Sequence, residues 1–367
     1  VSSSMAAMSR SFLSGAVSNS LGHDQRGTME LGITTFAETY PDPRTGETIS
    51  HAERLRQVVA EAEMTEQVGL DVYGVGEHHR PDFASSAPAV VLAAIAGRTE
   101  RIRLTPAVTI LSSDDPVRVF QQFATLDGVS SGRAELMIGR GSFIESFPLF
   151  GYDLADYDAL FEEKFELLLQ IRDNERVTWS GRFRPPLDNQ GIYPRPQQEP
   201  LPIWVAVGGT PASIVRAARH GLPVALAIIG GDPARFAPLA ELYRRTLEES
   251  GYDPETVPLA VHAHGYIADT TEQAVEEYYD AYAMAMTQLG YERGWGPMTR
   301  AQFDSLRSPN GSLVLGDVET VARKINRYKE HLGLDRFMLH ISVGTLPHEQ
   351  VLRSIELLGT EVAPLVR

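Results

Sequence analysis

The chain contains no cysteine, and this absence sets the first limits on its chemistry. Disulfides, thiolate metal sites and thiol nucleophiles are all excluded. Basic residues are also scarce: 33 Lys and Arg stand against 48 Asp and Glu, a formal net charge of −15 at pH 7. Nucleic acid is therefore not an expected partner, because its binding needs a basic face. An anionic cofactor is not excluded, since a few backbone N–H groups can hold a phosphate locally.

Long apolar runs are missing as well. The longest, around residues 87–96, is too short to span a bilayer, so no membrane association is expected. Residues 1–28 are rich in Ser, Ala and Gly and lack the pattern of a signal peptide. We interpret them as an N-terminal extension to a single domain over residues 29–367, and we expect a cytoplasmic location.

From residue 29 onward, short β-branched runs alternate with amphipathic helical stretches. This alternation predicts parallel strands joined by helices. The expected strands are residues 29–35, 71–76, 101–111, 133–138, 203–207, 223–229, 259–267 and 336–342. The period breaks at residues 177–200 and 291–312, which we interpret as insertions after strands four and seven. Eight strand–helix units predict an α/β fold of the (β/α)8 TIM-barrel type; a doubly wound sheet is the structural alternative.

Polar and glycine-rich residues follow several of these strands, where a barrel carries its functional groups. Glu77-His78-His79 is the strongest signal, since histidine titrates near neutral pH and suits acid–base or hydrogen-bond chemistry. The plain alternative is a polar strand end whose histidine caps a loop. A metal site is less favoured because neighbouring strand side chains point to opposite sides. His262 and His264 do alternate, which keeps a metal hydrolase as another reading.

Glycine-rich turns follow strands four, five and six. Gly208-Gly209-Thr210 precedes an expected helix, whose N-terminus attracts anions, and Thr210 and Ser213 can each offer a hydroxyl. The alternative is an ordinary strand–helix turn with Thr210 as the N-cap. Arg140 could face a phosphate or form a salt bridge at the rim.

Several runs in register carry a family resemblance. They are residues 69–73 before Glu77-His78-His79, residues 115–118, 126–133, 139–141 and 150–153, and then residues 202–205, 208–211 and 221–223. From Met29 to the C-terminus, the chain resembles the luciferase-like monooxygenases. The combination is far more specific than any single motif.

The resemblance implies a TIM barrel with insertions, usually a homodimer. It implies reduced FMN as cosubstrate, O2 as oxidant, and a flavin C4a-hydroperoxide that attacks an aldehyde or another small organic substrate. A separate NAD(P)H:flavin reductase usually supplies the flavin. The important histidine of the family falls on His78, with Glu77 and His79 beside it, and no metal is expected.

The cofactor-binding residues expected from motif and resemblance together share the strand ends of the barrel. They are Ala107, Val108, Thr109, Gly139, Arg140, Gly141, Gly208, Gly209, Thr210, Ser213, Ile229 and Gly230. Residues 106–109 align with a family segment that holds a non-proline cis peptide beneath the flavin ring. We therefore predict a cis Ala107–Val108 bond, and we expect the flavin phosphate at residues 208–213.

The chain also departs from the luciferases themselves. Asp158 stands where they have an arginine that binds the flavin phosphate, and Gly139 stands where they have a reactive cysteine. Light emission is therefore not predicted. Two other functions stay open: an F420-dependent oxidoreductase that transfers hydride without O2, which is less favoured, and a flavin-binding protein without turnover.

Overall fold

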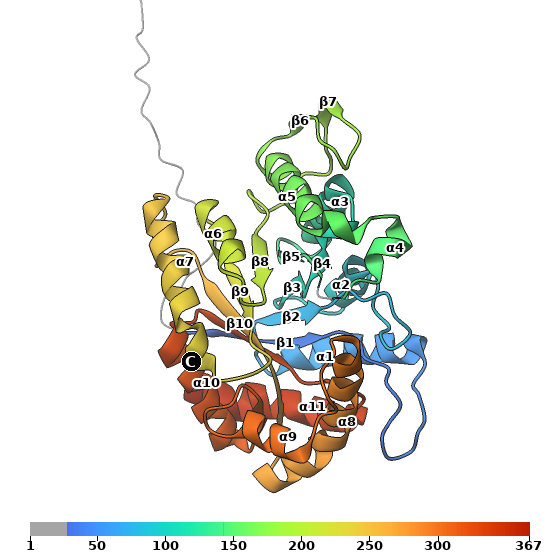
Figure 1. Ribbon diagram of the computed structural model, residues 1–367, viewed down its shortest axis with the longest axis vertical. Helices are drawn as coiled ribbons and strands as arrows, with labels where there is room; N and C mark the ends of the chain where they lie inside the picture. Colours follow the sequence, from blue (N-terminus) through green and yellow to red (C-terminus); the bar gives the residue numbers. More distant parts are fainter. Residues whose placement is uncertain (1–27, 142) are drawn as a thin grey trace, which may run out of the picture.

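The computed structural model describes residues 28–141 and 143–367 (Figure 1). Apart from Thr28, the expected N-terminal extension lies outside the described residues. Within those two ranges, no helix has the length and apolar character needed to cross a bilayer.

Eight parallel strands, which we call staves, form a barrel, and this confirms the predicted fold. One stave consists of two short strands in succession. The staves are β1 (Glu30–Thr35), β2 (Val72–Val75), β3 with β4 (Arg103–Pro106 and Thr109–Ile110), β5 (Leu136–Gly139), β8 (Ile203–Val207), β9 (Val224–Ala227), β10 (Leu259–Ile267) and β12 (Arg336–His340). They pair in the order β3-β2-β1-β12-β10-β9-β8-β5-β4. Because β12 pairs with β1, the last stave in the sequence closes against the first.

Helices cover the outside of the barrel, as the amphipathic stretches predict. They are α1 (His51–Gln67), α2 (Pro88–Ala96), α3 (Pro116–Val129), α4 (Ser146–Phe150), α5 (Tyr157–Asp173), α6 (Pro211–Arg219), α7 (Ala237–Glu249), α8 (Thr271–Glu292), α9 (Arg300–Arg307), α10 (Val318–Leu332), α11 (His348–Leu357) and α12 (Ala363–Val366). Several begin at caps visible in the sequence: Ser50 and Asp115 each accept a hydrogen bond from the first turn of α1 and α3.

The third stave differs from the single strand predicted over residues 101–111. Its first half, β3, pairs with β2, whereas its second half, β4, pairs with β5. Leu104 exchanges backbone hydrogen bonds with Arg133 and Glu135, at 3.0 and 2.9 Å, and so joins the two halves of the ring. The Ala107–Val108 peptide bond lies between β3 and β4 and is cis, which confirms the prediction.

The interior of the barrel is filled from alternate positions of its strands, because successive side chains point to opposite faces. The inner layer consists of Val72, Met137, Trp204, Ala225, Ala260 and Met338. At the amino end, the buried Arg336 guanidinium lies 4.3 Å from the Trp204 ring centre and donates to Glu135 at 2.6 and 3.0 Å. This plug leaves only the carboxyl ends of the strands open to a ligand.

The two insertions are more regular than their sequence suggested. The first carries an antiparallel hairpin of β6 (Arg176–Trp179) and β7 (Leu187–Gly191), which stands at one end of the molecule in Figure 1. The second contains α9, which the sequence analysis did not predict, and is followed by β11 (Val314–Gly316), which pairs with β10. A capping box between Thr299 and Gln302 starts α9, and Phe303 anchors it in the core.

Candidate active site

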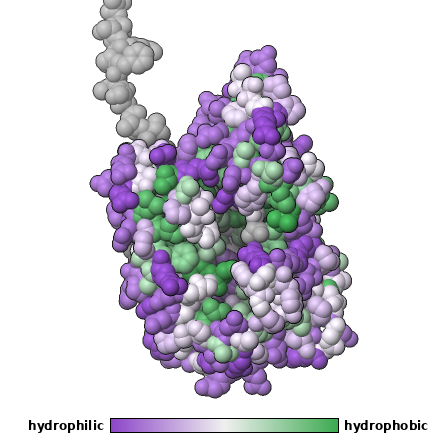
Figure 2. All heavy atoms as spheres, viewed as in Figure 1, coloured by the Kyte–Doolittle hydropathy of each residue, from purple (hydrophilic) through white to green (hydrophobic). Residues whose placement is uncertain are grey.

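A cavity of about 420 Å³ opens at the carboxyl ends of the strands. Figure 2 shows a hollow near the middle of one face of the molecule, with apolar side chains gathered around it. Most of the predicted site residues line the cavity: Glu77, His78, Ala107, Val108, Gly139, Arg140, Gly141, Gly208, Thr210, Ser213 and Ile229. The other four, His79, Thr109, Gly209 and Gly230, are not part of its lining.

His78 sits in an aromatic pocket immediately after β2. Its backbone N–H donates to the Ser85 carbonyl at 2.9 Å, which turns the chain at this point. The imidazole stacks on Phe83 with ring centres 4.3 Å apart and meets Phe36 edge-on at 4.7 Å. The side chain is buried, yet Nδ1 has no hydrogen-bond partner among the described residues. A polar atom of this kind, in a cavity wall, is suited to bonding with a ligand.

Glu145 is the charged neighbour of His78, and no motif pointed to it. Its Oε1 lies 3.8 Å from His78 Nδ1, longer than a hydrogen bond. Burial by itself would raise the pKa of Glu145, but His78 and then Arg80 lower it overall. A carboxylate therefore stands beside His78 at neutral pH.

His79 faces Glu77 instead of the cavity. Its Nε2 lies 2.9 Å from Glu77 Oε1, and Glu77 Oε2 accepts from the Ile110 N–H at 3.0 Å. Glu77 thus links the end of β2 to the strand that follows the cis peptide. The geometry agrees with a supporting position for His79.

The turn between β8 and α6 forms another part of the wall. Thr210 is the N-cap of α6, but its side chain makes no capping hydrogen bond, which differs from the plain-turn reading. The Thr210 hydroxyl is therefore not used up by the helix. Across the same cavity, the Arg140 guanidinium donates to Asp158 at 2.7 Å and lies 5.4 Å from the Tyr157 ring centre. Arg140 thus forms a salt bridge with Asp158, which is the alternative that the sequence left open for it.

Small residues line the centre of the cavity and leave room there for a flat ring. Ala107, Ala206, Ala225 and Ala227 all line the cavity, and a Cβ on Gly139 would lie 2.7 Å from Val108 Cγ2. Gly139 is therefore needed where β5 passes the segment after β3. A cavity of this volume and mixed lining is typical of a cofactor site.

Two buried residues of the wall escaped the sequence reading, Glu38 and His340. His340 lies beside His262 and His264 because β10 and β12 pair in register, with His264 opposite His340. Its Nε2 bonds to Glu38 Oε1 at 2.6 Å across 302 residues of sequence. Among the described residues, no cluster of three possible metal-ligating side chains has the geometry to hold an ion.

Comparison with known sequences gives the family. The luciferase-like monooxygenase family model matches residues 29–336. An alkanal monooxygenase alpha chain from Photorhabdus luminescens is 27% identical over 69% of this chain and 70% of its own length. A 4-hydroxyprotoasukamycin monooxygenase from Streptomyces nodosus subsp. asukaensis is 24% identical over 83% of this chain and 84% of its own length.

Solved structures agree in fold. Monooxygenase RslO1 from Streptomyces bottropensis superposes with a TM-score of 0.80, at 23% identity over 92% of this chain and 99% of that one. The oxygenating constituent of 3,6-diketocamphane monooxygenase from Pseudomonas putida, in complex with FMN, gives 0.71 at 19% identity over 92% and 98% of the two chains. An F420-dependent secondary alcohol dehydrogenase gives 0.73 at 19% identity over 93% and 99%. The chain therefore belongs to the luciferase-like monooxygenase family, and its relatives identify it as an enzyme of the monooxygenase class.

Proposed function

We propose that the protein is a two-component monooxygenase that binds reduced FMN in the cavity at the carboxyl end of the barrel and uses O2 on a small hydrophobic substrate. When bound, reduced FMN would supply the electrons that activate O2. The single observation that carries the proposal is His78: a buried imidazole whose Nδ1 has no hydrogen-bond partner in the described part of the chain, in the wall of a cavity large enough for a flavin.

The cavity offers separate places for the two ends of FMN. Its apolar floor, with Ala107 and Val108 at the third stave, suits the ring system. Thr210, Ser213 and the N-terminus of α6 suit the phosphate, and Arg140 supplies a positive charge in the same cavity. To contact the phosphate, Arg140 would have to exchange its bond to Asp158 for one to the ligand.

His78 is the residue that we assign to proton transfer. The stack on Phe83 fixes the plane of the imidazole, and Glu145 Oε1 lies 3.8 Å from its Nδ1. His78 can therefore hold a proton at Nδ1 and give it up to a bound oxygen atom in the cavity. Glu77 and His79 hold the end of β2 in place and do not contact the reacting atoms in this assignment.

The substrate side of the cavity is apolar. Phe143 from the loop after β5 lines it, together with Met286 and Leu289 from α8. These side chains favour a small organic molecule with a hydrophobic body, such as an aldehyde or a ketone, over a highly charged one. Because these residues lie on the loop after β5 and on α8, outside the strands of the barrel, they can determine the substrate without a change in the strands.

The cofactor is tested by ultraviolet–visible spectra of ligand extracted from the purified protein and by titration with FMN and F420. FMN binding, with oxygenation that depends on reduced FMN and O2, is the expected result. F420 binding with hydride transfer in the absence of O2 would replace this proposal; the likeness in fold to an F420-dependent dehydrogenase makes that the second candidate. Tight flavin binding without turnover of any aldehyde or ketone tested would instead indicate a flavin-binding protein.

The proposal has three further parts. A separate NAD(P)H:flavin reductase would deliver the reduced FMN, because the cavity must accept a flavin that is reduced elsewhere. A cytoplasmic location fits that supply of NAD(P)H. A homodimer is expected from the family resemblance and from the exposed apolar face of α2.

A further inference from the structure

Within the ranges that the structure describes, three residues that line the active-site cavity have a buried polar side-chain atom without a hydrogen-bond partner. The atoms are Thr34 Oγ1, His78 Nδ1 and His264 Nδ1. The proposed chemistry uses only His78. Thr34 is 1% exposed and His264 is 7% exposed, so both side chains are held inside the wall. Because a buried polar atom seldom stays unpaired, the cavity has to supply a partner for both, either water or a ligand.

Strand register brings Thr34 and His264 into one row. Thr34 of β1 is paired with His340 of β12, and His340 is paired with His264 of β10. All three line the cavity, as does His262, two residues before His264 on the same strand. Side chains two residues apart on a strand point to the same face. We refer to Thr34, His262, His264 and His340 as the polar wall.

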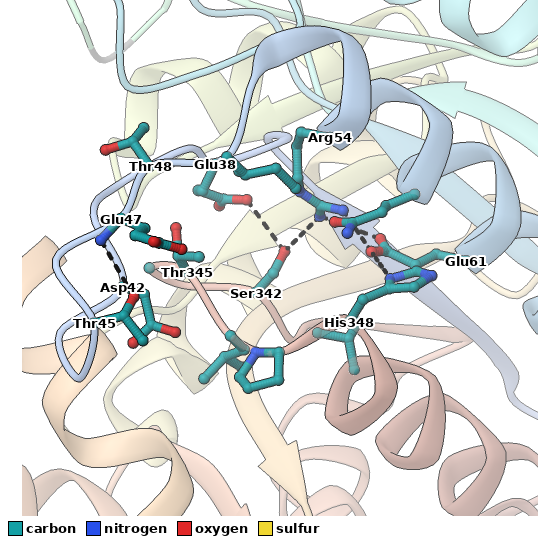
Figure 3. Close-up of a pocket in the computed structure, with 16 residues that line it drawn as sticks. Glu38, Asp42, Thr45, Glu47, Thr48, Arg54, Glu61, Ser342, Thr345 and His348 are labelled. Atoms are coloured by element: carbon teal, nitrogen blue, oxygen red, sulfur yellow. Dashed lines mark hydrogen bonds and ion pairs between the residues drawn. The ribbon is translucent and has the colours of Figure 1, made fainter.

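Part of the polar wall is already bonded within the protein. His340 Nε2 lies 2.6 Å from Glu38 Oε1, and His340 Nδ1 lies 3.3 Å from His262 Nε2. Figure 3 shows a second cavity that Glu38 also lines, where Ser342 Oγ donates to Glu38 Oε2 at 3.1 Å and accepts from Arg54 at 3.4 Å. Both oxygens of Glu38 and both ring nitrogens of His340 therefore have partners. The capacity of the polar wall to bond a ligand lies in its other members.

The two histidines of β10 offer no positive charge to a ligand. Burial, and next the neighbouring His340, lowers the pKa of His262 to about 3. The same causes, together with His262, hold the pKa of His264 well below its ordinary value of 6.5. Each neutral imidazole has one N–H donor and one acceptor nitrogen. Among the described residues through which β1, β10 and β12 line the cavity, none is Lys or Arg. This wall therefore suits an uncharged hydroxyl or carbonyl oxygen and disfavours a carboxylate.

Phe36 separates the polar wall from His78. Its ring meets the His78 ring edge-on with centres 4.7 Å apart, and it stacks on the His262 ring at 6.1 Å. Phe36 lines the cavity as well, so a ligand that bonds at both places passes over a phenyl ring. The small side chains that leave room for a flavin ring come from the other half of the barrel, on the third stave, β8 and β9. The polar wall thus lies on the side that a flavin would leave open.

We propose that the polar wall recognises a second oxygen on the substrate, which is a neutral, hydrophobic molecule with one carbonyl group near His78 and a hydroxyl or carbonyl oxygen at its other end, bonded to Thr34 and His264. This inference rests on the proposed oxygenase function and names its substrate class. Phe143 and α8 contact the hydrophobic body in between. A plain alkanal would leave the two polar atoms unpaired, and an acid at that end would bury a carboxylate without a cation.

Binding is tested first, without turnover, in protein that contains 15N-labelled histidine and oxidised FMN. The probes are 2-octanone, 2-nonanone and 2-decanone, each unsubstituted, with a hydroxyl group on the terminal carbon, and with a carboxylate there. For at least one chain length, the hydroxyketone should bind with a Kd roughly tenfold lower than the unsubstituted ketone and should shift the ring signals of His264. The His264→Leu variant assigns those signals, and His331→Gln, at an exposed position of α10, is the control.

Turnover then tests the two residues. The value of kcat/KM for the hydroxyketone is divided by that for the unsubstituted ketone within each variant, so that a loss of folded protein cancels. In His264→Leu and in Thr34→Val, which retains the shape of the side chain, we expect this ratio to fall by roughly fivefold to tenfold, through KM and not through kcat. His331→Gln should keep the ratio of the parent protein. Thr34→Val carries the test if His264→Leu does not fold.

The contrary outcomes are distinct from one another. A parent protein without preference for any hydroxyketone, or a ratio that stays at the parent value in both variants, overturns the proposal and leaves the two atoms to bound water. A loss of FMN affinity in His264→Leu as large as the loss of hydroxyketone affinity overturns it in favour of a flavin contact. Tighter binding of the keto acids overturns the uncharged substrate class. If FMN does not bind, or no probe is oxygenated, the proposed function is contradicted instead, and the same titration on flavin-free protein still decides whether the polar wall binds a hydroxyl group.

Discussion

At the scale of single residues, His78 and His79 show how neighbours in sequence can have different surroundings. His78 lines the cavity with an unpartnered Nδ1, whereas His79 is bonded to Glu77 outside it. We expect His78→Ala to lower turnover by roughly 10²-fold or more, as for the loss of an acid–base group, while the midpoint of urea unfolding changes little. Steady-state kinetics with reduced FMN checks this, and His79→Ala is the matched control. A severe loss of turnover in His79→Ala, together with unchanged turnover in His78→Ala, would reverse the assignment.

The imidazoles of β10 also predict how stability depends on pH. Burial lowers the pKa of His262 to about 3 and that of His264 well below its ordinary value of 6.5. Between about pH 6.5 and pH 3, the unfolded chain therefore binds protons that the folded protein does not, and stability falls as the pH falls. Each such group contributes about 1.4 kcal/mol per pH unit within the window.

Urea unfolding at pH 7 and pH 5 measures this loss. In His264→Gln, the free energy of unfolding should depend less steeply on pH, because one of the two groups is gone. The exposed His331→Gln should retain the slope of the parent protein. An unchanged slope in His264→Gln would show that His264 is already protonated in the folded state.

At the scale of elements, the turn from β8 to α6 allows binding to be separated from folding. A Cβ on Gly208 meets nothing within 4 Å, although Gly208 lines the cavity. Gly209 has φ +112°, so a substitution there strains the backbone as well. We expect Gly208→Val to occupy ligand space at a cost of about 1–3 kcal/mol, which lowers FMN affinity by roughly tenfold or more.

Fluorescence titration with FMN measures that affinity, and thermal unfolding of the ligand-free variant should match the parent protein. Gly128→Ala is the control, since its Cβ also meets nothing within 4 Å but lies in α3, away from the cavity. Equal FMN affinity in Gly208→Val would place the phosphate at another part of the rim.

The elements themselves differ in how far the sequence predicts them. The eight staves could be predicted because short β-branched runs alternate with helical stretches, which is a local pattern. Helix α9 was missed because it is short and lies among Gly and Pro, although Thr299 and Gln302 already form a capping signal. Glu38 and His340 could not be found by pattern, since 302 residues separate two groups that only barrel closure brings together. Helices and strands can thus be predicted from local sequence patterns, whereas contacts between side chains on strands far apart in the sequence cannot.

At the scale of the whole molecule, one buried ion network ties the start of the chain to its end. Arg336 of β12 donates to Glu135 before β5 and to Glu30 of β1, and Arg103 of β3 lies 3.4 Å from Glu135. Removal of Arg336 leaves the buried Glu135 carboxylate without its main partner. We expect Arg336→Met to lower the free energy of unfolding by about 3–5 kcal/mol.

Urea unfolding measures the change, and the double variant Arg336→Met with Glu135→Gln is the informative comparison. Glutamine removes the charge that Arg336 neutralised, so the double variant should be more stable than Arg336→Met alone. If the losses in the free energy of unfolding caused by the two substitutions simply add, the ion network contributes little beyond packing.

The outer surface, finally, predicts how the protein assembles. Helix α2 consists only of apolar residues, so one of its faces is left over after the other has packed on the barrel. Val90 on that face is 69% exposed, and Val129 at the end of the neighbouring α3 is 63% exposed. Exposed apolar side chains on neighbouring helices are typical of interaction surfaces. We therefore expect a homodimer that buries α2 and the end of α3, with twice the mass of the chain in light scattering at micromolar concentration.

Val90→Glu should give a folded monomer, because a carboxylate would be buried without a partner at the interface. Leu365→Glu, at an exposed apolar position of α12, should leave the dimer intact. A monomeric mass for the parent protein, or a Val90→Glu variant that still dimerises, would contradict this assembly.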